Sequence, residues 1–261
     1  MEPEQPNRKF WFTQSALKDM ERETTCPFRW KSQWLDGKIP FETNEFMDRG
    51  KYFEFLCIGG SARSDDEVTD LPRLRNGEKT AMQLRIEAQV AKFTCMFTPN
   101  NPQYIGHKIV DTQIEVRHNG RKGTIDFLTE DEDGTLWMWD LKLTSDAEST
   151  RTQYGYGNDW NEMDLMQLIH YYDLYKGKFN KPVRLALLVF DYSPSMNVKA
   201  NEIVVTEQAL DLKELRFTCA EHAVQKYEKY GWITIPSVHE CSACPLKCSA
   251  RIAEYNKQPK K

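Results

Sequence analysis

Two aspartates occupy polar positions in neighbouring segments that alternate between apolar and polar residues, Gly123–Leu128 and Trp137–Lys142. Such alternation is typical of β-strands, and folding the two strands about Asp133 places Asp126 opposite Asp140. Like charges directly opposite each other destabilise a hairpin unless something neutralises them. A hard divalent cation does so, since Mg²⁺ binds through one or two carboxylates. A metal site is therefore one interpretation of the pattern. Taken alone, the pattern favours the alternative of a solvated polar face with an ordinary salt bridge.

Lys142 follows Asp140 by two residues, so its side chain is expected on the same face of the strand. There it could orient or activate a water molecule, or stabilise charge that develops on a phosphate. The opposite face of the hairpin is expected to be apolar and to carry Ile125, Phe127, Trp137, Trp139, Leu141 and Leu143.

Two further fragments carry polar side chains that could complete this site. Gln167 and Tyr171 are spaced i, i+4, so they share one face of a predicted helix. Upstream, Glu54 follows Gly50 in the fragment Gly-Lys-Tyr-Phe-Glu. Each fragment also has a plainer interpretation, because an amphipathic tyrosine on a helix surface and a turn with an exposed charge are both common.

In their order along the chain, these fragments resemble the motifs of the PD-(D/E)XK nuclease superfamily, and within it the RecB-like exonuclease branch. Asp126 and Asp140-Leu-Lys142 are similar to the acidic strand motifs of the family. Gln167-Leu-Ile-His-Tyr171 is similar to the Gln-x-x-x-Tyr helix of that branch. The joint set of motifs is more specific than any one of them.

The resemblance implies metal-dependent hydrolysis of DNA phosphodiester bonds. The implied catalytic residues are Asp126, Asp140, Lys142, Gln167 and Tyr171. The implied ligands of one or two Mg²⁺ or Mn²⁺ ions are Glu54, Asp126 and Asp140. At Glu54 the chain departs from the RecB pattern, which has histidine, so direct and water-mediated binding of the metal both stay open.

The implied substrate is DNA that has free ends or is single-stranded, and an exonuclease is favoured. No helicase motif is present, so a helicase or a recombination or DNA-processing protein would be a separate partner. One alternative is a non-catalytic nucleic-acid-binding or scaffold module that retains the nuclease fold. A site-specific endonuclease is a further alternative, although no target-recognition domain is evident.

Four cysteines are expected to form a second metal centre. Cys241, Cys244 and Cys248 lie close together, and Cys26 precedes a proline near the other end of the chain. Thiols this close in an intracellular protein favour a metal or a cluster over free thiols. The arrangement is similar to the 4Fe–4S site of AddB-type helicase–nucleases and CRISPR-adaptation exonucleases, although Cys248 follows Cys244 at a shorter spacing. A structural Zn²⁺ with the same ligands is the alternative, since thiolates suit both.

Aromatic and basic side chains in the loop after the hairpin are candidates for contact with a DNA strand, because bases stack on rings and phosphates pair with cations. These candidates are Arg151, Tyr154, Tyr156 and Trp160. A similar mixture surrounds Phe10–Leu35, where most of the aromatic residues are instead expected to belong to the core.

Hydrophobic periodicity predicts helices that flank a mixed sheet, which is an α/β or α+β fold. The resemblance implies the α/β choice, with a mixed central sheet flanked by helices as in the core of restriction endonucleases. Helices are expected at Phe10–Leu35 (with a break before Pro27), Glu78–Phe97, Met163–Tyr175 and Glu207–Tyr230. Strands are expected at Ile109–His118, Gly123–Thr129, Thr135–Leu143, Val183–Tyr192 and Glu202–Thr206. The apolar residues noted at near-helical spacing in the second helix are Ala81, Leu84, Ala88 and Ala91. We expect one domain over residues 1–261, with an N-terminal helix region (10–35) joined by the cysteine site to a cysteine-rich tail (236–261).

The 261 residues include 35 Lys and Arg against 39 Asp and Glu, a net charge of −4. This balance argues against a purely electrostatic nucleic-acid binder, which needs excess basic charge. For a nuclease we expect Lys and Arg to ring the face that holds Asp126, Asp140 and Lys142. No run of about 18 apolar residues suggests a membrane span, and Met1–Asn7 does not resemble a signal peptide. An intracellular, cytoplasmic protein is therefore expected.

Overall fold

The computed structural model describes residues 10–22, 25–40, 44–59, 71–148, 165–232, 244 and 246. The chain divides into two compact units. Unit 1 comprises Met1–Glu42, Asn119–Arg121 and Gln208–Lys261, and unit 2 comprises Thr43–His118 and Lys122–Glu207. The expectation of a single domain over the whole chain stays a prediction.

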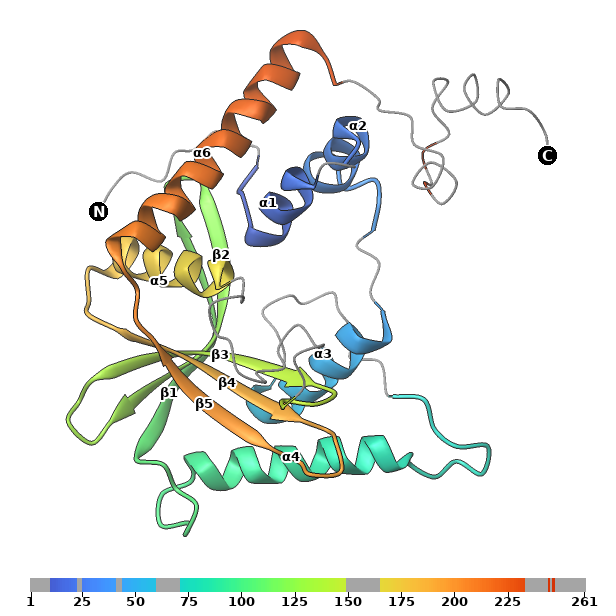
Figure 1. Ribbon diagram of the computed structural model, residues 1–261, viewed down its shortest axis with the longest axis vertical. Helices are drawn as coiled ribbons and strands as arrows, with labels where there is room; N and C mark the ends of the chain where they lie inside the picture. Colours follow the sequence, from blue (N-terminus) through green and yellow to red (C-terminus); the bar gives the residue numbers. More distant parts are fainter. Residues whose placement is uncertain are drawn as a thin grey trace. The chain divides into compact units, whose positions relative to one another are not determined.

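Among the described residues, five strands form one mixed sheet in the order β1-β2-β3-β4-β5 (Figure 1). β2 and β3 pair antiparallel, β3 and β4 parallel, and β4 and β5 antiparallel. The strands are β1 (His107–His118), β2 (Arg121–Asp131), β3 (Leu136–Thr144), β4 (Arg184–Asp191) and β5 (Val198–Ile203). The predicted mixed sheet is confirmed, and each predicted strand overlaps an observed one.

The register of the β2–β3 hairpin agrees with the predicted fold about Asp133. Cα partners include Phe127 with Trp139 and Leu128 with Met138. Asp126 directly precedes Phe127 and Asp140 directly follows Trp139, so the two aspartates come next to this pair on their strands.

Helices α3 (Glu45–Ile58) and α4 (Ala81–Phe97) lie on one side of this sheet (Figure 1). Aromatic rings dominate the cluster between these helices and the strands, so this face of the sheet is part of the core. Its buried aromatic members are Phe53, Phe93, Phe97, Phe127, Trp139, Phe190 and Tyr192.

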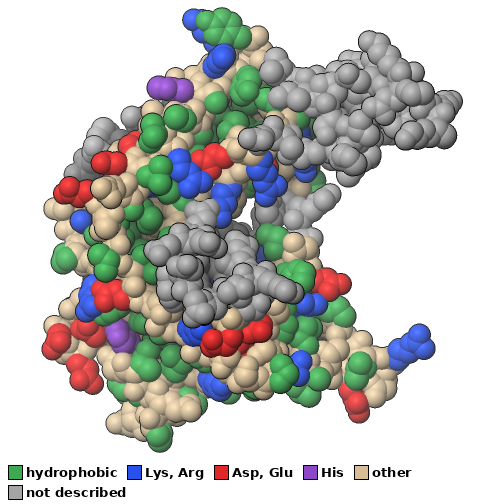
Figure 2. Space-filling view, viewed as in Figure 1, with side chains coloured by type: hydrophobic (Ala, Val, Ile, Leu, Met, Phe, Trp, Pro, Cys, Tyr) green, Lys and Arg blue, Asp and Glu red, His purple; other side chains and the backbone are tan. Residues whose placement is uncertain are grey.

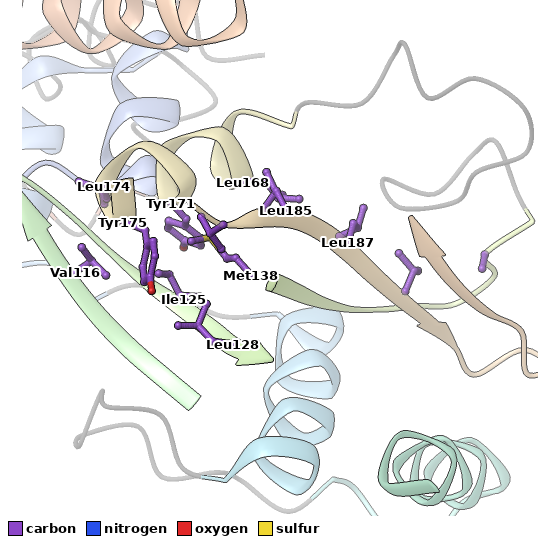
Figure 3. Close-up of a cluster of buried hydrophobic side chains, with 13 residues drawn as sticks. Val116, Ile125, Leu128, Met138, Leu168, Tyr171, Leu174, Tyr175, Leu185 and Leu187 are labelled. Atoms are coloured by element: carbon purple, nitrogen blue, oxygen red, sulfur yellow. The ribbon is translucent and has the colours of Figure 1, made fainter. Parts of the chain in front are cut away.

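Helix α5 (Met166–Phe179) lies on the other side of the sheet. Its apolar side chains Leu168, Tyr171, Leu174 and Tyr175 point toward the strands (Figure 3). The strand residues in this cluster include Val116, Ile125, Leu128, Met138, Leu185 and Leu187. The central strands β2, β3 and β4 therefore have buried side chains on both faces of the sheet.

The predicted face of Ile125 was wrong. Ile125 and Leu128 both pack on the α5 side, whereas Phe127 packs on the side of α3 and α4. Residues two apart in a regular strand share a face, so the alternation of β2 breaks at Asp126. The break in the alternation therefore coincides with Asp126, one of the two aspartates of the hairpin.

Helix α4 starts where Thr80 Oγ1 accepts a hydrogen bond from the backbone N–H of Gln83 at 3.1 Å. Its near-helical run of apolar residues does not mark the buried face, because Ala81, Leu84, Ala88 and Ala91 are exposed. Ile86, Phe93 and Phe97 are buried together with Gln83 and Gln89. Gln89 is tolerated there because its Nε2 donates to the Asp191 carbonyl at 2.6 Å.

Unit 1 contains α1 (Gln14–Glu21), α2 (Pro27–Trp30), the π-helix η1 (Lys31–Leu35) and most of α6 (Glu207–Tyr230). The predicted break before Pro27 is confirmed, and the predicted α6 matches at both ends. The expected N-terminal helix begins later than Phe10, after Thr13, whose Oγ1 accepts from the Ala16 N–H at 3.1 Å.

The aromatic residues of unit 1 form a core, as expected for most of them. Phe12, Leu17 and Trp30 are buried against Phe217 of α6. Trp30 Nε1 satisfies its hydrogen-bonding capacity by donating to the Ala16 carbonyl at 2.9 Å. In the described part of the chain, no helix is both long and apolar enough to span a membrane.

Candidate active site

Asp126 and Asp140 lie on adjacent strands and are both buried. The exposed fraction is 9% for Asp126 and 2% for Asp140, values that carboxylates reach only when paired or neutralised. The alternative of a solvated polar face is therefore wrong. Two buried acids side by side require a proton, a cation or strong donors nearby.

Asp126 is held to β3 by its own side chain. Its Oδ2 accepts a hydrogen bond from the backbone N–H of Leu141 at 2.7 Å. Burial raises the pKa of Asp126 well above its ordinary value, and the charges of Asp140 and Glu54 raise it further. Lys142 and the Leu141 N–H act in the opposite direction but do not cancel these effects. Without a cation, the site therefore favours protonated Asp126.

Asp140 presents one paired oxygen and one unpaired oxygen. Lys142 Nζ lies 2.6 Å from Asp140 Oδ2, and the lysine side chain is 15% exposed. Asp140 Oδ1 is buried and has no hydrogen-bond partner among the described residues. A buried carboxylate oxygen without a donor is rare and fits a bound cation. Carboxylate oxygens are also the donor atoms that Mg²⁺ and Mn²⁺ prefer.

Gln167 and Tyr171 meet on the sheet side of α5. Gln167 Nε2 lies 2.9 Å from Tyr171 Oη, to which it donates a hydrogen bond. Tyr171 is buried in the core between α5 and the strands (Figure 3). The alternative interpretation of Tyr171 as an amphipathic tyrosine on a helix surface is therefore wrong. Burial raises its pKa to about 12, and the charges of Asp126 and Asp140 contribute in the same direction.

Gly123 makes room for Tyr171 at the start of β2. A Cβ atom at Gly123 would lie 2.5 Å from Cε1 and 2.6 Å from Cδ1 of the tyrosine ring. Real Cβ atoms are not found that close to a ring carbon. The glycine that precedes Asp126 by three residues therefore lets the ring lie against the strand.

Glu54 reaches the site from α3. Gly50 and Glu54 both lie within this helix, four residues apart. The alternative interpretation of this fragment as a turn with an exposed charge is therefore wrong. Glu54 is partly buried, and its Oε1 accepts a hydrogen bond from Gln113 Nε2 at 2.7 Å. Sequence reasoning missed Gln113, because nothing in β1 links it to a helix so far away along the chain.

The implied third ligand, Glu54, contributes to the raised pKa of Asp126. However, the three acids do not form a tight cluster. Within the described residues, no group of three or more His, Cys, Asp or Glu side chains is arranged to hold a metal ion. Lys142 contacts Asp140 directly, whereas the Glu54 carboxylate is hydrogen-bonded to Gln113.

Several predicted site residues lie outside the described residues. These are Arg151, Tyr154, Tyr156, Trp160, Cys241 and Cys248. Cys26 and Cys244 are described, and both are partly buried. Cys26 is the N-cap of α2, directly before Pro27.

Comparisons with known proteins identify a family and a fold. A family model described as the PD-(D/E)XK nuclease superfamily matches residues 13–249. The structure is similar to a protein from Eubacterium rectale described as an exonuclease, with a TM-score of 0.57 and 16% identity over 97% of this chain and 90% of that one. An alkaline exonuclease from Laribacter hongkongensis gives a TM-score of 0.47 and 13% identity over 85% of this chain and 92% of that one. A search of curated proteins finds no significant match. The first structural similarity shows a shared fold.

Proposed function

The chain belongs to the PD-(D/E)XK nuclease superfamily, and on that premise we propose that it is a metal-dependent deoxyribonuclease. One observation carries the proposal. Two carboxylates are buried side by side, and one of them has an oxygen without a donor while Lys142 contacts the other oxygen. Such an arrangement costs folding free energy, and groups of this kind cluster at functional sites.

Asp126 and Asp140 would hold Mg²⁺ or Mn²⁺, with Glu54 as a further ligand, direct or through water. When bound, the cation supplies Lewis-acid chemistry, which activates water and stabilises negative charge on a phosphate. The oxygen-only donor set supports a hard cation rather than a thiophilic one.

Lys142 is the residue proposed to orient or deprotonate the attacking water molecule. Its Nζ lies 2.6 Å from Asp140 Oδ2, and its side chain is 15% exposed. From there it can orient a water molecule or take its proton. The ion pair with Asp140 also keeps the lysine side chain in place before substrate arrives.

Tyr171 and Gln167 are proposed to position the DNA backbone. With a pKa of about 12, Tyr171 keeps its proton at neutral pH. Because Gln167 Nε2 donates to the Tyr171 oxygen, the hydroxyl hydrogen is directed away from Gln167 and toward an acceptor such as a phosphate. Arg151, Tyr154, Tyr156 and Trp160 are proposed to contact the strand.

We further propose an exonuclease of the RecB-like branch that acts on DNA ends or single strands. The Gln167-x-x-x-Tyr171 pair supports this choice. A helicase or recombination protein would be a separate partner. The second candidate, a non-catalytic DNA-binding module, is disfavoured by the intact contact between Lys142 and Asp140.

For the cysteines we propose a 4Fe–4S cluster bound by Cys26, Cys241, Cys244 and Cys248, with Zn²⁺ as the alternative. The closeness of the three C-terminal cysteines along the chain supports a metal or cluster, although the gap from Cys244 to Cys248 is shorter than in the related 4Fe–4S sites. Its role would be structural, because metal binding contributes directly to folding free energy.

The proposed activity is tested with end-labelled linear DNA and a covalently closed single-stranded circle, each with Mg²⁺ or with a chelator. We expect the linear DNA to be degraded only in Mg²⁺ or Mn²⁺ and the circle to stay intact. Cleavage of the circle would identify an endonuclease, and binding without cleavage in either metal would favour the non-catalytic module.

A further inference from the structure

Gln113 has an unusual backbone conformation for a residue inside a strand. Its φ of 52° lies in the left-handed region, which residues other than glycine adopt infrequently. Such a conformation persists where surrounding interactions require it, and it is often found beside functional sites. The interaction that stands out here is the hydrogen bond from Gln113 Nε2 to Glu54 Oε1, at 2.7 Å.

The position of Gln113 connects this hydrogen bond to the acidic site. β1 and β2 are neighbours joined by the turn at Asn119 and Gly120. Gln113 therefore lies on the strand that is hydrogen-bonded to β2, the strand of Asp126. The amide therefore anchors a carboxylate from helix α3 to the sheet beside the aspartates.

An anchor is needed because a glutamate side chain has several rotamers of similar energy. Glu54 is only partly buried, and packing alone does not fix its carboxylate. A donor to one of its oxygens selects one orientation, and a hydrogen bond to an ionised group is among the stronger kinds. Phe53, which precedes Glu54 on α3, packs in one buried cluster with Phe127 and Trp139, so this part of α3 lies against the strands that carry the aspartates.

We propose that Gln113 is a positioning residue, which holds Glu54 toward the cation site of Asp126 and Asp140 and so sets the affinity for the cation. The inference rests on the proposed nuclease function. It assigns Gln113 no contact with DNA and no role in proton transfer.

The first test is Gln113→Gly, with Mn²⁺ binding measured by isothermal titration calorimetry. Removing a partner that orients a metal ligand typically weakens metal binding by about 10–100-fold, so a loss of at least about tenfold is expected. The thermal midpoint of the metal-free protein should not fall, because glycine adopts positive φ without strain. Met196→Gly is the matched control, since Met196 has a φ of 50° in the β4–β5 loop, and it should leave Mn²⁺ affinity unchanged.

A double-mutant cycle separates positioning from a general structural role. In the background of Glu54→Gln, the further change Gln113→Gly should have little effect on Mn²⁺ affinity, because the carboxylate it orients is gone. An equal loss in both backgrounds would overturn the proposal. If Gln113→Gly does not fold, Gln113→Asn takes its place, because asparagine tolerates the left-handed region while its shorter amide falls short of Glu54.

The outcomes distinguish this inference from the proposed function. Wild-type protein that binds no Mn²⁺ and cleaves no DNA would remove the function on which the inference depends. Wild-type protein that binds and cleaves, together with a Gln113→Gly variant of unchanged Mn²⁺ affinity, would overturn the positioning role alone.

Discussion

At Asp126, burial and neighbouring negative charge both favour the protonated carboxyl. The residue is buried, and the charges of Asp140 and Glu54 oppose its ionisation. A single N–H donor from Leu141 and the charge of Lys142 compensate only in part. Without a cation, this carboxylate is a cost to folding at neutral pH, and a cation would convert it into an attraction.

The variant Asp126→Asn tests this balance, because its amide oxygen can still accept from the Leu141 N–H. Because the pKa of Asp126 is raised in the folded state, its protonated carboxyl contributes to the stability of the wild type fully below the ordinary pKa of 3.8. This contribution is lost as the pH rises through the folded-state pKa. The metal-free variant should therefore be the more stable protein at pH 8, and the advantage should shrink toward pH 4.

The measurement is urea unfolding of both metal-free proteins across this pH range. Added Mg²⁺ should reverse the order, stabilising the wild type and not the variant. A stability difference that does not change with pH would contradict the raised pKa.

At the scale of elements, the site depends on how α5 lies against the sheet. Gly123 permits contact between Tyr171 and β2, and Gly177 permits contact between α5 and His118 of β1, where a Cβ would lie 2.5 Å from the ring. Both glycines serve packing, but only Gly123 contacts a residue of the candidate site.

Gly123→Ala is expected to push Tyr171 away from the aspartates. Overpacking of this kind costs about 1–3 kcal/mol, and cleavage per folded molecule should fall as well. Gly177→Ala is the matched control, with a similar stability loss but normal cleavage when the folded fraction is equal. The account of Tyr171 fails if both variants lose activity to the same degree.

Local patterns predicted the elements that position the aspartates. The alternation in β2 and β3 was strong enough to predict the register that brings Asp126 to Asp140. It did not predict the break in β2 that turns Ile125 toward α5, because such irregularities depend on what packs around the strand. Likewise, the apolar run Ala81, Leu84, Ala88 and Ala91 did not predict the buried face of α4, which includes Gln83 and Gln89.

Long-range polar contacts were beyond reach from the sequence. The hydrogen bond between Gln113 and Glu54 joins residues that are distant along the chain and depends on a left-handed backbone at Gln113. A glutamine in a strand pattern does not predict a left-handed backbone, so the positioning role of Gln113 could be inferred only from the structure.

At the scale of the whole molecule, an acidic total charge is compatible with the proposed DNA substrate. On the face that Figure 2 displays, Lys and Arg side chains are intermixed with Asp and Glu, so this face is not uniformly negative. The expected ring of Lys and Arg around the aspartates stays a prediction.

The cysteine cluster is a proposal about the stability of the whole chain. Cys26→Ala should lower the thermal midpoint by roughly 5–10 °C and remove iron, because loss of a ligand removes binding free energy that contributes to folding. Cys219→Ala, at an exposed position on α6, is the control. Protein purified without oxygen should be brown. A colourless protein with bound zinc would replace the cluster by Zn²⁺, and an unchanged midpoint and metal content would exclude both.

The central claim is that Lys142 and the two aspartates hydrolyse DNA. The most direct measurement is the Mg²⁺-dependent cleavage rate of end-labelled linear DNA by Lys142→Gln, whose amide can still donate to Asp140 but cannot accept a proton from water. With Lys108→Ala on the exposed side of β1 as the control, Lys142→Gln is predicted to lose at least about 100-fold in rate while keeping its fold. Cleavage by Lys142→Gln at the wild-type rate would contradict this assignment of the active site.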